Sequence, residues 1–194
     1  MITRIFCLFF SISASIPFGL PTARADAPFS KEVSLLAGIS QGYGDGLSKT
    51  TSPAYTFFYA RSFKEPKAEH FLLRVIADTI VTELTTSANP IALLEASKST
   101  TAVLIRFGFS GCYLWSNVWM GCLDDGPRLT YLLQGSTNAQ TLGSFPLGAS
   151  LHYGGLFPWI ITSRAEHGRW DSREKGVSKN NSVNLFLLGA GYNW

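Results

Sequence analysis

Apolar and polar residues alternate along most of this chain, and the alternation is clearest near its C-terminus. Two stretches, Phe157–His167 and Asn184–Trp194, carry a bulky or aromatic side chain at most second positions. Because successive side chains of a β-strand point to opposite faces, these stretches are predicted to form a hairpin with one apolar face. That face ends in His167 on the first strand and begins with Asn184 on the second. An antiparallel hairpin therefore brings these two residues together beside the connecting loop.

The same period of two recurs in earlier segments, which brings the count to about eight predicted strands. An even number of antiparallel strands is typical of small outer-membrane barrels. The sequence therefore predicts an all-β fold, an antiparallel eight-stranded transmembrane outer-membrane β-barrel. The earlier segments are Val33–Gln41, Ala54–Ser62, Glu69 to about Leu84, Thr100–Ser110, Arg128–Gly135 and Phe145–Tyr153.

The connections between the predicted strands are of two kinds. If the N-terminus is periplasmic, the long connections lie outside and the short ones on the periplasmic side, which is the usual asymmetry of such barrels. The stretch Gly111–Pro127 is the exception, because it is long where a short turn is expected, and we interpret it as a loop closed by its cysteines. A helical turn is expected at Ile91–Ala96. The long connections are Gly42–Pro53, Thr85–Ser99, Ser136–Ser144 and Gly168–Ser182, and the short ones are Phe63–Lys67 and Gly154–Gly155.

Charged side chains fall on the strand faces opposite to the apolar ones. A lipid-facing charge costs roughly 2–4 kcal/mol at the middle of a bilayer, and about eight strands leave an interior that side chains just fill. We therefore expect a salt-bridged core inside the barrel, not a pore lining and not a catalytic cluster. A soluble, secreted lipocalin-like barrel with apolar side chains inside is the alternative. The predicted inward residues are Arg74, Asp78, Arg106, Arg128, His152, Arg164 and Glu166, together with His70.

The last predicted strand favours the membrane over the secreted alternative. Its terminal Trp194, with Tyr192 two positions earlier, resembles the C-terminal signal by which outer-membrane proteins are recognised for insertion. The outer-membrane insertion machinery is therefore an expected partner of this strand. The bacterial outer membrane is the expected location.

The N-terminus has the features of a secretory signal. Arg4 precedes an apolar stretch, and Ala23 and Ala25 supply small residues at the two positions that a signal peptidase reads. Residues 1–25 are therefore predicted to be a signal peptide, followed by a single barrel domain at 26–194. A buried N-terminal helix is the alternative, which Pro17 disfavours.

Composition narrows the classes of function further. A hydrophobic fraction of 46% is too apolar for a disordered chain. Cleavage removes Arg4 and Arg24 from 16 basic residues, which leaves 14 against 13 acidic ones, and this balance gives no reason to expect nucleic acid. Cys112 and Cys122 are a disulfide candidate in an oxidising compartment, with two free thiols as the alternative. The sequence has no glycine-rich phosphate loop and no metal-binding motif, so no cofactor and no metal is expected.

The C-terminal part of the chain resembles a known family. Leu147–Tyr153, then Arg164-Ala165-Glu166-His167, then Asn184 are similar to lipid A 3-O-deacylases of the PagL type, the acyloxyacyl hydrolase family. The resemblance implies an eight-stranded outer-membrane barrel with an active site on its lipid-facing wall. It also implies a serine, activated by a histidine and oriented by an acidic residue, that cleaves an ester-linked acyl chain from lipid A.

The family motif, His-x-Ser-Asn followed by a distant acidic residue, is only partly present. His167 matches the histidine, whereas Arg169 stands at the serine position, Trp170 at the next and Asn184 at the acidic position. A guanidinium stays protonated and is no nucleophile. An amide holds an imidazole in one tautomer but does not stabilise the imidazolium by charge.

Other serines lie near His167 and are candidate replacement nucleophiles. Ser182 shares the predicted outward face with Asn184, and Ser172 lies in the predicted loop. The alternative for Ser182 is an ordinary hydroxyl near the start of a strand.

Arginines also gather around His167. Arg164, Arg169 and Arg173 are predicted to bind substrate, because guanidinium forks suit phosphate groups and lipid A carries phosphates. A solvated loop is the alternative. Two functions follow: an esterase that removes an acyl chain from lipid A, or a catalytically inactive barrel with a structural or lipopolysaccharide-binding role. The expected partner in both cases is an outer-membrane lipid, lipopolysaccharide or phospholipid, and a homodimer is a further candidate assembly.

Overall fold

The structure is a computed structural model, and it describes residues 29–45, 47–63, 70–86, 98–134, 138–156, 158–174 and 177–194. Side chains are described for these residues except 86, 98, 134, 138–142, 170–174 and 177–179. The predicted signal peptide and the predicted helical turn at Ile91–Ala96 lie outside the described residues. Within the described ranges, no helix is long and apolar enough to cross a membrane.

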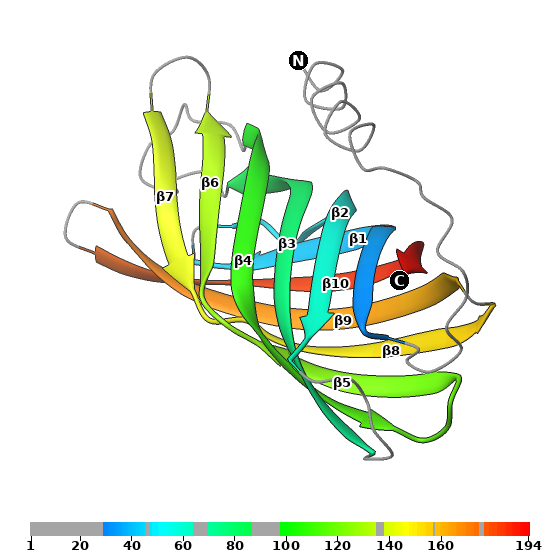
Figure 1. Cartoon of the computed structure of the whole chain (residues 1–194). Coiled ribbons are helices and arrows are strands. Elements are labelled where there is room, and N and C mark those ends of the chain that lie inside the picture. The colour runs from blue at the N-terminus through cyan, green and yellow to red at the C-terminus, as the bar shows by residue number, and fades with distance from the viewer. Residues whose placement is uncertain are drawn as a thin grey trace.

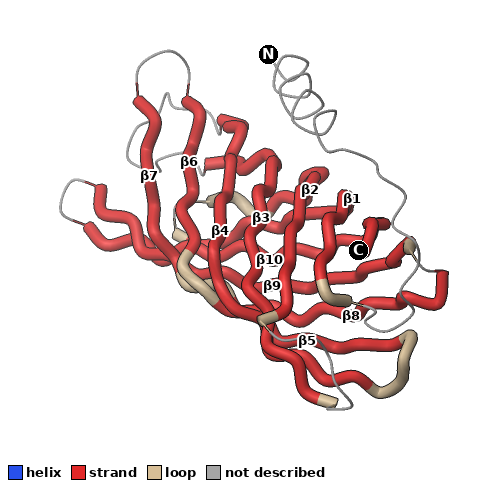
Figure 2. The backbone as a smooth tube through the Cα atoms, in the orientation of Figure 1, coloured by secondary structure: helices blue, strands red, loops and turns tan. Residues whose placement is uncertain are grey.

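The described chain folds almost entirely into strands (Figure 2), as the alternating pattern predicts. In the first strand Leu35 and Ile39 are exposed, whereas the intervening Leu36 and Ser40 are buried. The strands are β1 (Lys31–Gly44), β2 (Thr50–Ser62), β3 (Phe71–Thr86), β4 (Lys98–Leu114), β5 (Trp119–Asp125), β6 (Arg128–Gln134), β7 (Asn138–Ser144), β8 (Leu147–Leu156), β9 (Trp159–Glu174) and β10 (Val177–Asn193).

The strands close into a ring (Figure 1). Hydrogen-bonded neighbours follow the order β3-β2-β1-β10-β9-β8-β5-β4, and β3 also pairs with β4, which completes a ring of eight antiparallel strands. β6 pairs with β4 further along that strand, and β7 pairs with β6, so β5–β6 and β7–β8 each form one long interrupted strand. The predicted all-β, eight-stranded outer-membrane barrel is confirmed as the fold.

Two prolines interrupt these long strands at one level of the barrel. Pro127 separates β5 from β6, and Pro146 separates β7 from β8. Arg128 pairs with Ser144 just beyond both interruptions, so the two prolines lie at matching heights. A proline has no N–H to donate and does not continue a ladder on that side.

The strand ends differ from the predicted ones around the predicted loops. Gly111–Pro127 is not a long loop, because β4 runs to Leu114 and β5 begins at Trp119. The predicted loops Ser136–Ser144 and Gly168–Ser182 are largely strand, as β7 and as the extended ends of β9 and β10. Their small and polar residues alternate weakly in hydrophobicity, and the pairing with a neighbouring strand holds them extended nonetheless.

The outer wall is apolar, so the lipocalin-like alternative with apolar residues only inside is wrong. Aromatic rings gather at the end where β1 begins and β10 ends, here named the terminal end, with the opposite end named the loop end. The ring centroids of Trp119 and Tyr153 are 4.7 Å apart, and those of Trp159 and Tyr192 are 5.7 Å apart. Such aromatic girdles are typical of a membrane interface. Exposed apolar side chains on the wall include Leu35, Leu73, Phe107, Phe109, Leu123, Leu147, Phe186 and Leu188.

The barrel interior holds the predicted salt-bridged core. Asp78 Oδ2 accepts hydrogen bonds from Arg106 Nη2 and from Arg164 Nη1, each at 2.7 Å. Glu166 contacts the same arginines and Arg128, and the predicted internal cluster is thereby confirmed. A lone buried charge would cost several kcal/mol, and pairing between arginines and carboxylates offsets part of that cost. The buried charged residues are Glu32, Arg74, Asp78, Arg106, Asp124, Arg128, Arg164 and Glu166.

Apolar clusters pack beside the charges inside the barrel. At the terminal end Phe29 is fully buried against Met120 and Ile160. Ser30, near the start of the described chain, meets Trp194 at the same place, where Ser30 Oγ donates a hydrogen bond to the carbonyl oxygen of Trp194 at 2.8 Å. The larger cluster comprises Leu36, Leu47, Ala54, Phe58, Ala60, Ile76, Ile80, Leu84, Ala102, Leu104, Leu132, Val183, Leu185 and Leu187.

One predicted inward residue, His70, lies elsewhere. It precedes β3 at the terminal end and is exposed, with Nδ1 3.1 Å from the carbonyl oxygen of Leu114. The prediction was wrong because alternation was extended past the start of β3, to a residue at the end of the barrel.

Candidate functional site

His167 and Asn184 lie opposite each other on the outer wall. β9 and β10 pair antiparallel with His167 directly across from Asn184. Nδ1 of His167 is 2.8 Å from Oδ1 of Asn184, and the histidine is exposed. Both residues share the outward face of the strands, as the alternation predicts.

The hydrogen bond sets the tautomer of His167. An amide oxygen only accepts hydrogen bonds, so Nδ1 of the neutral imidazole carries the proton in this arrangement. The lone pair is then on Nε2, which is the nitrogen that accepts a proton in general-base catalysis. Asn184 therefore does for His167 what an orienting residue does in a catalytic triad, without supplying a negative charge.

The register separates Ser182 from His167 by one pair along the face. Ser182 is directly opposite Arg169, not His167. Diagonal neighbours on paired strands lie about 7–8 Å apart, compared with about 5 Å for direct partners. The structure therefore keeps Ser182 on the predicted face and near the histidine, while the amide of Asn184 takes the direct position.

Arg169 is exposed on the same face as His167. Its Nη2 donates a hydrogen bond to Oδ1 of Asn180 at 3.1 Å. The backbone N–H of Asn180 in turn donates to Oδ2 of Asp45 at 3.1 Å. Polar groups thus continue along β9, β10 and the end of β1 on the loop side of His167. Side chains of two further predicted site residues, Ser172 and Arg173, lie outside the described ones.

Arg164 does not belong to this surface group. Its side chain is inside the barrel, where Nη2 donates to Glu166 Oε2 at 2.8 Å and Nη1 contacts Asp78. Arg164 occupies an inward position of β9, whereas His167 and Arg169 occupy outward ones. Its role in substrate binding stays a prediction.

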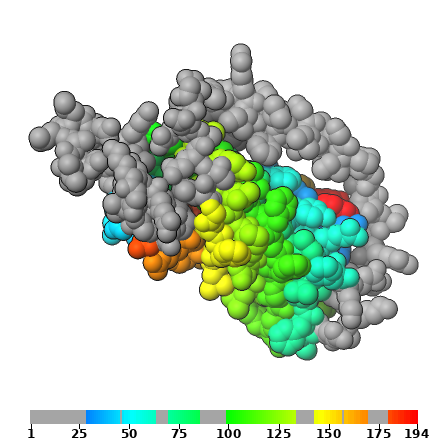
Figure 3. All heavy atoms as spheres, turned by 90° about the vertical axis from the view of Figure 1, so that its left-hand side faces the viewer, coloured from blue at the N-terminus to red at the C-terminus, as the bar shows by residue number. Residues whose placement is uncertain are grey.

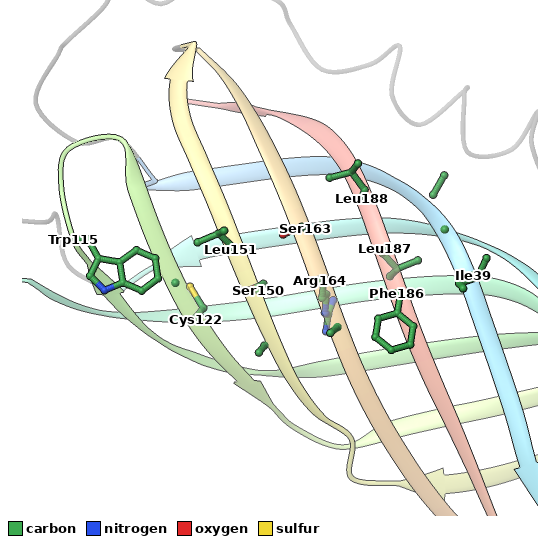
Figure 4. Close-up of a pocket in the computed structure, with 15 residues that line it drawn as sticks. Ile39, Trp115, Cys122, Ser150, Leu151, Ser163, Arg164, Phe186, Leu187 and Leu188 are labelled. Atoms are coloured by element: carbon green, nitrogen blue, oxygen red, sulfur yellow. The ribbon is translucent and has the colours of Figure 1, made fainter.

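A groove of about 790 Å³ crosses the outer wall on the terminal side of the His167–Asn184 pair (Figure 4). The pair of residues next along β9 and β10, Ala165 and Phe186, belongs to the groove lining. The groove therefore ends where the polar residues begin. Small outward residues line it on neighbouring strands: Ala37, Gly121, Ala149, Ser163 and Ala165.

Large apolar side chains border the groove. Figure 4 shows Trp115 at one side of it, on the turn between β4 and β5, with Ile39 and Phe186 at the other side. Leu151 and Leu188 complete this border. Pockets that bind small ligands typically have volumes of roughly 300–1,000 Å³, so the groove is large enough for part of a lipid.

A second histidine has triad-like bonding but lies inside the barrel. His152 Nε2 is 3.0 Å from Ser150 Oγ, and its Nδ1 is 3.1 Å from Glu32 Oε2. Thr162 Oγ1 also donates to Glu32, at 2.8 Å. His152 and Glu32 are fully buried, and Ser150 is buried beside them. The group is part of the interior polar network.

The predicted disulfide is confirmed, between Cys112 on β4 and Cys122 on β5. The two residues are direct ladder partners and are buried at the terminal end. Among the described residues, no group of three or more His, Cys, Asp or Glu side chains is placed to hold a metal ion.

Sequence reasoning missed the groove and part of the interior cluster. Glu32 follows from alternation, since it precedes Val33 on the opposite face, but it lay outside the predicted strand. Asp124 lay in the stretch interpreted as a loop. The groove depends on which small residues become neighbours across β1, β10, β9, β8 and β5, and only the strand register decides that.

Comparison with known proteins addresses the fold. No family model matches the sequence, and no curated protein matches it. Neisserial surface protein A aligns with 85% of this chain and 97% of its own chain, at 13% identity and a TM-score of 0.51. Ail, the attachment invasion locus protein of Yersinia pestis, in complex with the heparin analogue sucrose octasulfate, aligns with 84% of this chain and 98% of its own, at 16% identity and a TM-score of 0.48. The likeness to Neisserial surface protein A supports the barrel seen here, whose apolar wall and charged interior are those of an outer-membrane β-barrel.

Proposed function

We propose that this chain resides in the bacterial outer membrane and binds an amphiphilic lipid on its outer wall. One acyl chain lies in the groove, and the headgroup lies beside His167, Asn184 and Arg169. The observation that carries the proposal is the position of the groove, which leads along the lipid-facing wall to the polar pair.

The groove suits an acyl chain in size and chemistry. Alanines and glycine leave room between strands, and Leu151, Phe186 and Leu188 offer apolar contact to a chain lying among them. Dispersion contacts of this kind are individually small but sum over a chain of many methylenes. A lipid held there exchanges contacts with mobile neighbours for contacts with a fixed surface.

The polar residues beyond the groove suit a headgroup with phosphates or hydroxyls. Arg169 supplies a guanidinium, and His167 and Asn184 supply neutral hydrogen-bonding groups. Guanidinium groups bind phosphate in a fork geometry. Lipopolysaccharide, whose lipid A carries phosphates, and phospholipids are the lipid classes of the outer membrane that present this chemistry.

A groove-filling variant tests the binding proposal. Ala165→Trp places an indole in the groove, whereas Ala77→Trp places one on the outer face of β3, away from the groove. Native mass spectrometry of barrels released from bilayers containing diphosphoryl lipid A counts the lipids retained. We expect Ala165→Trp to lower retention about tenfold and Ala77→Trp to leave it unchanged. Equal retention by both folded variants would contradict the proposal.

Ester hydrolysis at the same place is the second candidate function. The hydrogen bond from Nδ1 of His167 to Asn184 leaves Nε2 free to accept a proton. Nε2 would take the proton of the Ser182 hydroxyl or of a water, whose oxygen adds to the ester carbonyl carbon. The proton then passes to the departing alkoxide, and with water as nucleophile the products are a fatty acid and the deacylated lipid.

Mass spectrometry of lipid A separates the two functions. Membranes with the native chain are compared with membranes carrying His167→Ala and Ser182→Ala. Loss of an acyl chain with the native protein and not with His167→Ala supports hydrolysis, and the Ser182 variant then assigns the nucleophile. Unchanged lipid A with a folded native barrel would rule out hydrolysis and leave lipid binding.

A further inference from the structure

The barrel is closed by hydrogen bonds over only part of its height. The ladder between β8 and β9 ends at the pair Leu147↔His167. Among the described residues, β7 pairs only with β6, and β9 beyond His167 pairs only with β10. Figure 3 shows this side of the molecule, with β7 in yellow beside the orange of β9. We name the unpaired boundary between β7 and residues 168–174 of β9 the seam.

The prolines account for the end of the ladder. Pro146 lies directly before Leu147, the last residue of β8–β9 pairing, and has no N–H to offer β9. Pro127 interrupts the neighbouring long strand at the same level. β6 and β7 therefore follow β4, with which β6 is paired, while β9 and β10 continue in their own direction (Figure 1).

The corner of the seam combines a proline, a glycine and an arginine. A Cβ atom placed on Gly168 would lie 3.4 Å from Pro146 Cβ and 3.6 Å from Arg128 Nη1. Arg128 therefore lies behind the first residue of β9 after the ladder ends. Every second residue along the two open edges also directs its backbone N–H and C=O into the seam.

Arg128 has unused hydrogen-bonding capacity. Its side chain is 1% exposed, and Nη1 is paired with Glu166 Oε1. Nε and Nη2 have no hydrogen-bond partner, and Asp78 Oδ1 is 3.8 Å from Nη2, beyond hydrogen-bond distance. A buried guanidinium usually satisfies its donors, and an unsatisfied one costs roughly 1–3 kcal/mol or more.

We propose that the seam binds the phosphate of a lipid headgroup. This inference rests on the proposed lipid binding, and it places the headgroup phosphate at the corner formed by Pro146 and Gly168. The guanidinium of Arg128 lies on the inner side of that corner, with Nη1 nearest to it. The guanidinium of Arg169 lies on the outer face, and the open backbone N–H groups lie along the edges. The carboxylate nearest to Arg128 is Glu166, whose charge is shared with Arg106 and Arg164.

The position of the seam on the barrel is compatible with a surrounding bilayer. Unpaired backbone groups are not tolerated in the hydrocarbon core, so an open edge belongs at headgroup level or in water. His167 and Asn184 place polar groups on the wall at the height where the seam begins. An acyl chain in the groove and a phosphate in the seam are then successive parts of one lipid.

A reversible disulfide lock across the seam tests the phosphate-binding proposal. If pairing continued past Leu147↔His167, residue 143 would face residue 171. The pair Gly143→Cys and Asp171→Cys, once oxidised, therefore closes the seam. The matched pair Gly143→Cys and Leu129→Cys joins β6 and β7, which are already paired, and leaves the seam open. Retention of diphosphoryl lipid A and of its dephosphorylated form is counted by native mass spectrometry before and after reduction.

We expect the oxidised seam lock to lower retention of the diphosphoryl lipid about tenfold, to leave the dephosphorylated lipid unaffected, and to be reversed by reduction. The control lock should change nothing. Equal loss in both locks, or no loss in the seam lock, would overturn the proposal. Competition by inorganic phosphate without any preference for phosphorylated lipid would assign the seam to free phosphate and overturn the lipid assignment.

A second pair of variants does not depend on disulfide formation. Gly168→Phe fills the seam corner, whereas Gly143→Phe points into space where a Cβ meets nothing within 4 Å. We expect only Gly168→Phe to reduce retention of the diphosphoryl lipid. Should Ala165→Trp abolish lipid retention while both seam tests have no effect, wall binding stands and the seam proposal falls. Should none of the variants matter, both fall.

Discussion

Nδ1 of His167 lies 2.8 Å from Oδ1 of Asn184 across the β9–β10 ladder, on the face of the barrel that meets lipid. A base held in one tautomer is present, but the direct position across from it is occupied by an amide rather than by a carboxylate. The nucleophile position suggested by the family resemblance holds Arg169. The outer wall thus holds a histidine oriented by an amide, without a carboxylate directly opposite it.

Restoring the serine and the acidic residue of the family motif should create or increase ester hydrolysis. Arg169→Ser with Asn184→Asp places a hydroxyl on the outward face of β9 and a carboxylate opposite His167. Because a triad carboxylate is worth about 10⁴ in rate in the serine-protease example, we expect fatty-acid release from lipopolysaccharide to rise by at least about 100-fold. Release is measured by mass spectrometry of the free acid.

The control for this restoration is Arg169→Ala with Asn184→Asp, which supplies the carboxylate without the hydroxyl. It should stay at the level of the native chain. Equal rates for the two double variants would mean that residue 169 does not reach the ester.

Removing one carboxylate from the interior should destabilise the barrel strongly. Asp78→Asn removes the negative charge shared by Arg106 and Arg164, each of which donates to Asp78 Oδ2 at 2.7 Å. An uncompensated buried charge costs about 3–5 kcal/mol in the free energy of unfolding. Guanidinium unfolding of the barrel in lipid vesicles measures it, with exposed Asp125→Asn as a control expected to change stability by less than about 0.5 kcal/mol.

The disulfide should stabilise the barrel without being needed for its formation. Cys112 and Cys122 are separated by 10 positions, and closing so short a loop removes unfolded-state entropy worth roughly 2–3 kcal/mol. Replacing both cysteines with alanine should lower the free energy of unfolding by about that amount while the β4–β5 ladder still forms. Reductant should lower the free energy of unfolding of the native chain and leave that of the variant unchanged. A variant that does not form the barrel would contradict the expectation that the β4–β5 ladder forms without the disulfide.

The stability cost of a charge on the outer wall should show which part of the wall lies in the bilayer. Phe107 is 66% exposed in the central part of β4, whereas Tyr113 lies at the aromatic end of the same strand. Phe107→Arg should cost about 2–4 kcal/mol in vesicles, compared with about 0–1 kcal/mol for Tyr113→Arg near the interface. Similar costs at both positions would place β4 outside the lipid.

The sequence predicted which face each strand residue takes, because alternation has a period of two and the interior and the lipid demand opposite chemistry. Alternation alone therefore predicts that Arg74, Asp78 and Arg106 lie in the interior. The same argument placed His167 and Asn184 outward. The number of strands in the barrel, and the inward or outward direction of each strand residue, could therefore be predicted from residue types alone.

Register and ladder ends were not accessible in this way. Ser182 has the predicted face, yet only the pairing shows that it is opposite Arg169 and not His167. Pro127 and Pro146 are visible in the sequence, but their shared level depends on how β6 pairs with β7. The groove and the seam are both products of these cross-strand relationships, so neither follows from one segment read by itself.

The contact between Ser30 and Trp194 has a consequence for how the barrel assembles. The two residues are 164 positions apart, and the strands beside them, β1 and β10, are paired in the ring. Closure therefore requires β10 to be synthesised, and contacts so distant in sequence form slowly. Until β10 pairs with β1, both strands have an unpaired edge, and exposed edges with apolar faces favour aggregation.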